Sequence, residues 1–251
     1  MVQVRVNTLR EMQDGLILVF DLDQALIDSR GLVREKNNGW KNIESYIQKS
    51  LNMRIVEEIL RPAVALRRSA FGQGLGLSQG ARVAAIILLT NNITEFYIDC
   101  VEYYIARHLG ILSESVFDYV MKRDDSMRAF PPFNPPKRLE DIENILKKIN
   151  KPTDNLASRT FMFDDCDRHK IKYDLADAGY PDHYIQIIGP EDMCLPIHGI
   201  INEGYIAGEP DLTDYTAVLK AMNVEPEAEA EPLEALETIP SICSMNEIMG
   251  F

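Results

Sequence analysis

Cysteine is scarce in this chain and widely spread. Only four occur among 251 residues, and no two of them form a Cys-x-x-Cys pair: Cys100, Cys166, Cys194 and Cys243. A disulfide framework or a structural zinc site needs cysteines at short, regular spacings, so neither is expected. A reducing compartment fits this cysteine usage best.

The start of the chain also lacks a basic region followed by an apolar stretch and a small-residue cleavage site. Its apolar run, Leu16–Phe20, is far shorter than the roughly 20 residues that a membrane-spanning helix needs. We therefore expect a soluble cytoplasmic protein with no membrane partner, with the nucleus as the open alternative.

Basic side chains are in the minority. Lys and Arg number 26 against 39 Asp and Glu, for a net charge of −13. Beyond Val224 there are seven Glu and no Lys, Arg or Asp, so this part carries −7 and the rest only −6. No basic stripe marks a nucleic-acid surface. The Glu- and Pro-rich composition predicts an acidic, disordered tail over 224–251, whose more apolar end, Ile239–Phe251, could dock a protein partner.

Short apolar runs alternate with helical patterns along the remainder of the chain. The runs predict strands at Leu16–Phe20, Val83–Leu89, Val116–Met121, Thr160–Phe163 and Tyr184–Ile188. Helices are predicted at 43–51, 56–69 (with Pro62 early or at a break), 94–108 and 139–149. In the third helix, Phe96, Cys100, Tyr103 or Tyr104, and Arg107 recur at helical spacing. This alternation predicts an α/β fold, a Rossmann-like three-layer sandwich around a mostly parallel sheet.

A glycine-rich stretch at 71–80 contains Gly72-x-Gly74 followed by Gly76. It neither follows a strand nor opens a helix, as a dinucleotide-binding loop would. We interpret it as a connector.

Polar residues follow three of the predicted strands at the point where each strand ends. Asp21 and Asp23 follow the first, Thr90, Asn91 and Asn92 the second, and Asp164 and Asp165 the fourth. On a strand, Asp21 and Asp23 share one side. Alone, such acids could simply solvate a strand end. However, ligands of parallel α/β sheets bind at the carboxyl ends of the strands, near a topological switch point. The sequence therefore predicts one site at this edge.

The residue types suit the hydrolysis of phosphate monoesters. A carboxylate can accept the phosphoryl group, and a second acid can protonate the leaving oxygen and then activate water. A hydroxyl and a lysine can stabilise the phosphate oxygens, and further carboxylates can hold Mg²⁺. Lys137, at the start of a predicted helix, completes this set.

In this order the motifs resemble those of the haloacid dehalogenase-like (HAD) hydrolase superfamily. The first motif is similar to Phe20-Asp21-Leu22-Asp23-Gln24-Ala25-Leu26. The second resembles Ile86–Thr90, the third is a Lys before a helix, and the fourth resembles Phe161–Asp165. The resemblance covers about Leu16 to Gly189 and is most specific in its first and fourth motifs.

The resemblance implies Asp21 as the nucleophile and Asp23 as the general acid and base. It also implies that Thr90, with Asn91 nearby, binds the phosphate and that Lys137 stabilises it. Mg²⁺ would be held by Asp164 and Asp165 together with Asp21 and the carbonyl of Asp23. Because dehalogenases of this superfamily lack the second Asp, the resemblance favours phosphatase chemistry.

Two departures and one ambiguity accompany this resemblance. Ala25 stands where the family has Thr or Val, and Gln24 replaces a small or acidic residue, so activity could be reduced. Lys122 and Arg123 are alternatives to Lys137 for the third motif.

The spacings leave no room for a large cap domain. We predict a catalytic domain over 1–223 with a small helical insert at about 28–82, followed by the tail. An open site would accept a phosphoprotein, a nucleic-acid end or a metabolite. Leu60-Arg61-Pro62 and Phe117–Asp124 resemble, over short fragments, the phosphatases related to those acting on the RNA polymerase II C-terminal domain.

Two other classes remain open at this stage. The chain could be a weakly active or inactive relative that works as a binding module through its tail. It could also resemble response-regulator receivers, which use acids, a Thr and a Lys at strand ends but are about half this length.

Overall fold

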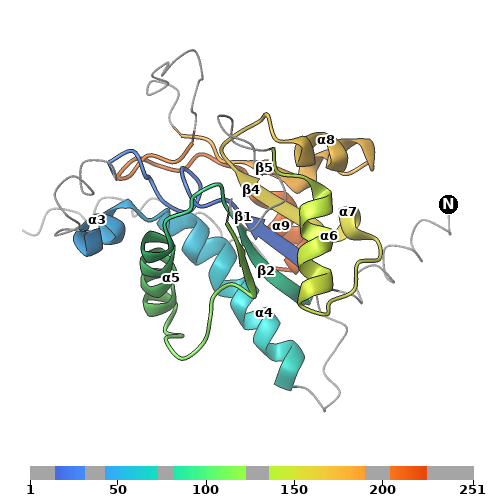
Figure 1. The fold of residues 1–251 in the computed structure, drawn as a ribbon, viewed down its shortest axis with the longest axis horizontal. Coiled ribbons are helices and arrows are strands. Elements are labelled where there is room, and N and C mark those ends of the chain that lie inside the picture. Colours follow the sequence, from blue (N-terminus) through green and yellow to red (C-terminus); the bar gives the residue numbers. More distant parts are fainter. Residues whose placement is uncertain (1–14, 32–42, 73–81, 123–135, 190–203, 225–251) are drawn as a thin grey trace, which may run out of the picture.

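A computed structural model describes residues 15–31, 43–72, 82–122, 136–189 and 204–224. Within these ranges five strands form one sheet, in the order β3-β2-β1-β4-β5, and every neighbouring pair is parallel (Figure 1). The strands are β1 (Leu16–Phe20), β2 (Val83–Leu89), β3 (Tyr119–Met121), β4 (Thr160–Asp164) and β5 (Tyr184–Gln186). The predicted α/β class and parallel sheet are confirmed.

Helices cover both faces of the sheet because the side chains of each strand alternate between them. Leu18 and Phe20 of β1 belong to the larger core, and Ile17 and Val19 to the smaller one. The larger core is covered by α3 (Ile43–Ser50), the π-helical η2 (Ile55–Leu60), α4 (Arg61–Gly72), α5 (Glu95–Leu109) and α9 (Thr216–Met222). The smaller core is covered by α6 (Leu139–Lys148), α7 (Leu156–Arg159) and α8 (Lys170–Asp177), and η4 (Pro181–His183) precedes β5. The described residues thus form a three-layer sandwich without a large cap domain.

The helix predicted at 56–69 consists of two pieces, η2 and α4. Pro62 is the second residue of α4, early in its helix as predicted. Since Pro62 has no N–H to donate, regular α-helical hydrogen bonding cannot continue through it, and the π-helical turns end just before it. Helices α7, α8 and α9 were not among the predicted elements. No helix in the described ranges is long and apolar enough to cross a membrane.

The limits of the predicted domain, insert and tail stay predictions. Within the predicted insert, buried side chains of η2 and α4 pack in the larger core with those of β1. The tail beyond Val224 and most of the glycine-rich connector lie outside the described residues.

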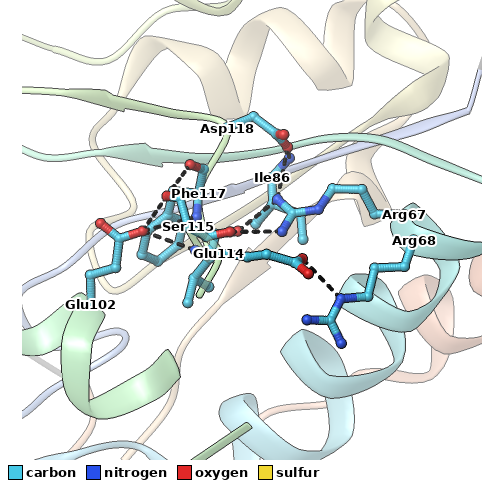
Figure 2. A network of polar contacts seen from close by, with 9 residues as sticks. Arg67, Arg68, Ile86, Glu102, Glu114, Ser115, Phe117 and Asp118 are labelled. Carbon is cyan, nitrogen blue, oxygen red and sulfur yellow. Dashed lines mark hydrogen bonds and ion pairs between the residues drawn. The ribbon is translucent and has the colours of Figure 1, made fainter. Parts of the chain in front are cut away.

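Strand β3 begins at Tyr119, later than predicted, and side-chain bonds hold much of the segment before it (Figure 2). The Asp118 carboxylate accepts the N–H of Ile86 at 2.8 Å. Arg67 of α4, which is buried, donates to the carbonyl oxygens of Ser115 and Val116, each at 2.8 Å. These bonds fasten the loop before β3 to α4. The N–H of Asp118 also donates to the Ile86 carbonyl at 2.7 Å, and the paired register with β2 starts at Tyr119.

Candidate active site

The predicted polar strand ends meet where the order of the sheet reverses. From β1 the chain adds β2 and β3 on one side of the sheet and β4 and β5 on the other. Crossovers that diverge in this way leave a crevice at the carboxyl ends of the central strands. Phe20 of β1 is in register with Leu88 of β2 and Phe163 of β4, which places Asp21 beside Asp164.

Asp21 is buried at the end of β1, with 8% of its surface exposed. Its N–H donates to the Phe163 carbonyl at 2.8 Å, which continues the pairing with β4 past the last strand residue. Its Oδ1 accepts the N–H of Leu22 at 2.8 Å and lies 2.8 Å from Nζ of Lys137. Burial raises the pKa of Asp21, the charge of Lys137 opposes this rise, and the charge of Asp164 adds to it.

Lys137 is fully buried between two carboxylates. Its Nζ lies 2.8 Å from Oδ1 of Asp21 and 2.5 Å from Oδ2 of Asp164. Burial lowers the pKa of Lys137, but the charges of Asp164 and Asp21 outweigh burial and raise it. Of the candidates for the third motif, Lys137 is therefore the one that contacts Asp21. Lys122 forms an ion pair with Glu95, and Arg123 lies outside the described residues.

Three carboxylates form a group that could hold a cation. Ligand oxygens of Asp21, Asp164 and Asp165 all lie within 4.8 Å of one another. Burial, followed by the charges of Asp164 and Asp21, raises the pKa of Asp165 well above its ordinary value. Three carboxylates face one lysine, so the ionised site carries surplus negative charge in a region of low dielectric. Oxygen donors with surplus charge fit Mg²⁺, which favours carboxylates, waters and phosphate oxygens.

The carboxylate of Asp23 is not part of this group in the described structure. Asp23 lies in a turn after β1, where the carbonyl of Leu22 accepts the N–H groups of Leu26 at 3.1 Å and Ile27 at 3.2 Å. Gln24 adopts a left-handed conformation with φ of 64° within this turn. Burial raises the pKa of Asp23, and the charge of Asp21 adds to this rise. A raised pKa favours the protonated form, which is the form a general acid needs.

The loop after β2 brings three polar side chains to the same edge. Thr90 is fully buried, and its Oγ1 accepts the N–H of Asn92 at 3.0 Å. Accepting this bond does not use the hydroxyl hydrogen, which can donate to a phosphate oxygen. Oδ1 of the half-buried Asn91 is a buried atom with no hydrogen-bond partner within the described residues. Asn92, which the sequence places at this strand end without a role, donates from Nδ2 to Oδ2 of Asp23 at 3.1 Å.

His169 is a residue that sequence reasoning missed. Its place after the fourth motif, like that of Asp167 and Lys170, indicates only a helix start or a surface position. It does precede α8, but only 8% of its surface is exposed. Its Nδ1 accepts the backbone N–H of Lys137 at 3.1 Å, so the proton of the neutral ring lies on Nε2, which is 3.7 Å from Oδ1 of Asp164. The His four residues after Asp165 was the only signal, and it is not specific.

Gly204 brings a distant segment against the site. A Cβ at this position would lie 2.5 Å from Cβ of Gln24 and 2.7 Å from Cβ of Asp165. The next residue, Tyr205, donates its N–H to the Gln24 carbonyl at 2.8 Å. Only a residue without a side chain can pass so close. A single glycine in an irregular segment carries no signal of this role.

Ala25, the departure in the first motif, is fully buried in the larger core. Its carbonyl accepts a hydrogen bond from the side chain of Asn52 at 3.1 Å. The effect of this residue on activity stays a prediction.

Comparisons with known proteins add little to this site. No protein-family model and no curated protein matches the chain. One similar solved structure is described as "putative beta-phosphoglucomutase from Thermotoga maritima". The match covers 65% of this chain and 81% of that one, at 13% sequence identity and a TM-score of 0.28. None of the comparisons supports the narrower resemblance to C-terminal-domain phosphatases. At this level of similarity no residue role can be transferred, and the candidate active site rests on its own geometry.

Proposed function

We propose that this chain is a Mg²⁺-dependent phosphohydrolase of the HAD type that cleaves phosphate monoesters through an aspartyl-phosphate at Asp21. The observation that carries this proposal is the contact of Asp21 with the buried Lys137, beside the acidic group formed with Asp164 and Asp165. A carboxylate next to a fixed cation can receive a phosphoryl group while the cation stabilises charge on the phosphate oxygens.

The first half-reaction forms a bond between an Asp21 oxygen and phosphorus and breaks the bond to the leaving oxygen. Asp23, whose raised pKa favours the protonated form, gives its proton to that leaving oxygen and releases an alcohol. Lys137 and the hydroxyl of Thr90, with Asn91 beside it, stabilise the transferring phosphoryl group.

The second half-reaction hydrolyses the aspartyl-phosphate. Asp23, now ionised, takes a proton from water as the water oxygen attacks phosphorus. The bond to Asp21 breaks, inorganic phosphate is released, and both carboxyl groups return to their starting states. Asp23 therefore donates a proton in the first half-reaction and accepts one in the second.

Mg²⁺ would be held by Asp21, Asp164 and Asp165, with the carbonyl of Asp23 as a further ligand implied by the family resemblance. When bound, Mg²⁺ neutralises charge on the phosphate oxygens and on the carboxylates. The substrate would be a phosphoprotein, a nucleic-acid end or a phosphorylated metabolite. The rival hypothesis of a binding module depends on 225–251, which lies outside the described residues.

The test is hydrolysis of 4-nitrophenyl phosphate with Mg²⁺ or with EDTA. Asp21→Asn should abolish the Mg²⁺-dependent turnover while the circular dichroism spectrum stays unchanged, because an amide cannot form the phosphorylated intermediate. Asp177→Asn, at an exposed position that ends α8, is the matched control and should retain full turnover. Unchanged turnover in Asp21→Asn would exclude this residue as the nucleophile.

A second measurement detects the intermediate without turnover. Beryllium fluoride with Mg²⁺ imitates an aspartyl-phosphate, so it should raise the melting temperature of the unaltered protein but not that of Asp21→Asn. If neither protein responds to Mg²⁺ or to beryllium fluoride, the binding-module hypothesis gains over the enzymatic one.

A further inference from the structure

The surroundings of Asp23 place one more residue in the reaction. Nδ2 of Asn92 lies 3.1 Å from Oδ2 of Asp23, and these residues come from the loop after β2 and the turn after β1. The bond joins two segments about 70 residues apart in the chain, and both lie at the carboxyl edge of the sheet.

The orientation of the Asn92 carboxamide follows from its other partner. The backbone N–H of Thr94 can only donate, and it lies 2.9 Å from Oδ1 of Asn92. That contact assigns the carboxamide oxygen to Thr94 and leaves the NH₂ group for Asp23. The backbone N–H of Asn92 is itself held by Oγ1 of Thr90 at 3.0 Å, so the side chain projects from a fixed loop.

A donor on one carboxyl oxygen decides which oxygen can carry the proton. A protonated carboxyl group has one accepting carbonyl oxygen and one hydroxyl. Because Asn92 offers Asp23 an N–H, Oδ2 must act as the acceptor, and the proton belongs on Oδ1. Oδ1 of Asp23 has no hydrogen-bond partner within the described residues, and the hydroxyl of Ser29 is the other polar group beside this carboxyl.

The first turn of α5 lies beside the same acid. Tyr97, in this turn, is fully buried, and its hydroxyl has no hydrogen-bond partner in the described part of the chain. Burial raises the pKa of Tyr97, and Asp23 makes the largest contribution among the neighbouring charges. Residues of the loop 90–94 and of the first turn of α5 therefore both lie beside Asp23.

We propose that Asn92 is a positioning residue, which holds Asp23 through Oδ2 and leaves Oδ1 to carry the proton that goes to the leaving oxygen. This inference rests on the proposed function, since it assigns no new reaction. It predicts that loss of Asn92 lowers kcat/KM most where the leaving oxygen depends most on the proton of Asp23.

The test compares leaving groups that need the proton to different degrees. Phenol is a much weaker acid than 4-nitrophenol, so phenyl phosphate depends on Asp23 far more than 4-nitrophenyl phosphate does. Asn92→Ser keeps a side-chain oxygen for the Thr94 N–H but is too short to reach Asp23. It should lower kcat/KM for phenyl phosphate by about 10-fold or more and for 4-nitrophenyl phosphate by no more than about 2-fold. Asn92→Ala, which also removes the bond to Thr94, should give the same kinetic pattern with lower stability.

A double-mutant cycle separates positioning from a structural effect. When Asp23→Asn is already present, Asn92→Ser should lower kcat/KM by no more than about a further 2-fold for either substrate. In urea unfolding, the cycle of Asn92→Ser with Asp23→Ala should give non-additive midpoints, because the bond from Asn92 needs an acceptor oxygen at position 23 and alanine has none. Equal losses on both substrates, multiplying losses in the Asp23→Asn background, or additive midpoints would overturn the inference.

These experiments also distinguish a failure of this inference from a failure of the proposed function on which it rests. If Asp21→Asn abolishes turnover but the leaving-group dependence of Asn92→Ser equals that of the unaltered protein, only the role of Asn92 fails. If Asp21→Asn retains turnover, the proposed function fails, and this assignment fails with it.

Discussion

Replacing Lys137 by Met tests the electrostatic centre of the site. Methionine has nearly the shape of lysine but no charge, so the change leaves Asp21 and Asp164 buried without their shared cation. At separations of 2.8 and 2.5 Å, each pair is worth about 6 to 7 kcal/mol of Coulomb energy at an effective dielectric constant of about 20. The desolvation of Lys137 offsets much of this energy, so the net loss of stability should be about 3 to 5 kcal/mol.

The assay is urea unfolding in EDTA at neutral pH. A loss of this size should lower the urea midpoint by about 1 to 2 M, given the usual dependence of stability on urea. Lys147→Met, on α6, is the matched control. Lys147 forms an exposed pair with Glu143 at 2.6 Å, and such a pair contributes about 0.3 to 0.5 kcal/mol.

A second substitution distinguishes loss of charge balance from loss of packing. Adding Asp164→Asn to Lys137→Met removes one of the stranded carboxylates, so the double variant should be more stable than Lys137→Met alone, while both lack turnover. The electrostatic account is refuted if Lys137→Met unfolds at the midpoint of the Lys147→Met control, or if Asp164→Asn destabilises it further.

Three further predictions concern Asp165, His169 and Gly204. The pKa of Asp165 is raised in the folded state, so the folded protein binds more protons than the unfolded chain. Stability in EDTA should therefore fall as pH rises from about 4, and a flat or rising profile would contradict this. His169→Ala should weaken Mg²⁺ binding by about 10-fold, measured by thermal shift against Mg²⁺ concentration, because Lys137 and Asp164 lose their support; unchanged binding would remove His169 from the site. Gly204→Ala should cost about 1 to 3 kcal/mol of stability and reduce turnover, because the new methyl group would contact Asp165. Gly208→Ala is the control: φ is 82° there, and beyond the neighbouring residues no atom lies within 4 Å of an added Cβ. It should lower stability but retain turnover. Equal turnover in the two glycine variants would show that the close approach at Gly204 is not needed.

The strands and their polar ends were predictable because both are local features. An apolar run on a buried parallel strand is visible in a few consecutive residues, and β1, β2 and β4 have nearly the predicted limits. Helix α5 has nearly its predicted length, but only part of the predicted stripe is buried. Of the two alternatives, Tyr104 is buried and Tyr103 is half exposed. Phe96 is also half exposed, whereas its neighbour Tyr97 is buried. Two neighbouring apolar stripes fit the same period, and only contact with the sheet selects between them.

The sequence by itself determined that acids, a hydroxyl and an amide follow three buried strands, because composition and period are properties of the chain. Tertiary structure decided which other residues join them. It placed Lys137 rather than Lys122 at Asp21, Asn92 on Asp23, and Gly204 against Asp165. Each of these partners comes from a different segment, and their meeting depends on the order of strands in the sheet. Parallel strands are joined by long crossovers, so neighbours at the site are distant in the chain, and no local pattern encodes their contact.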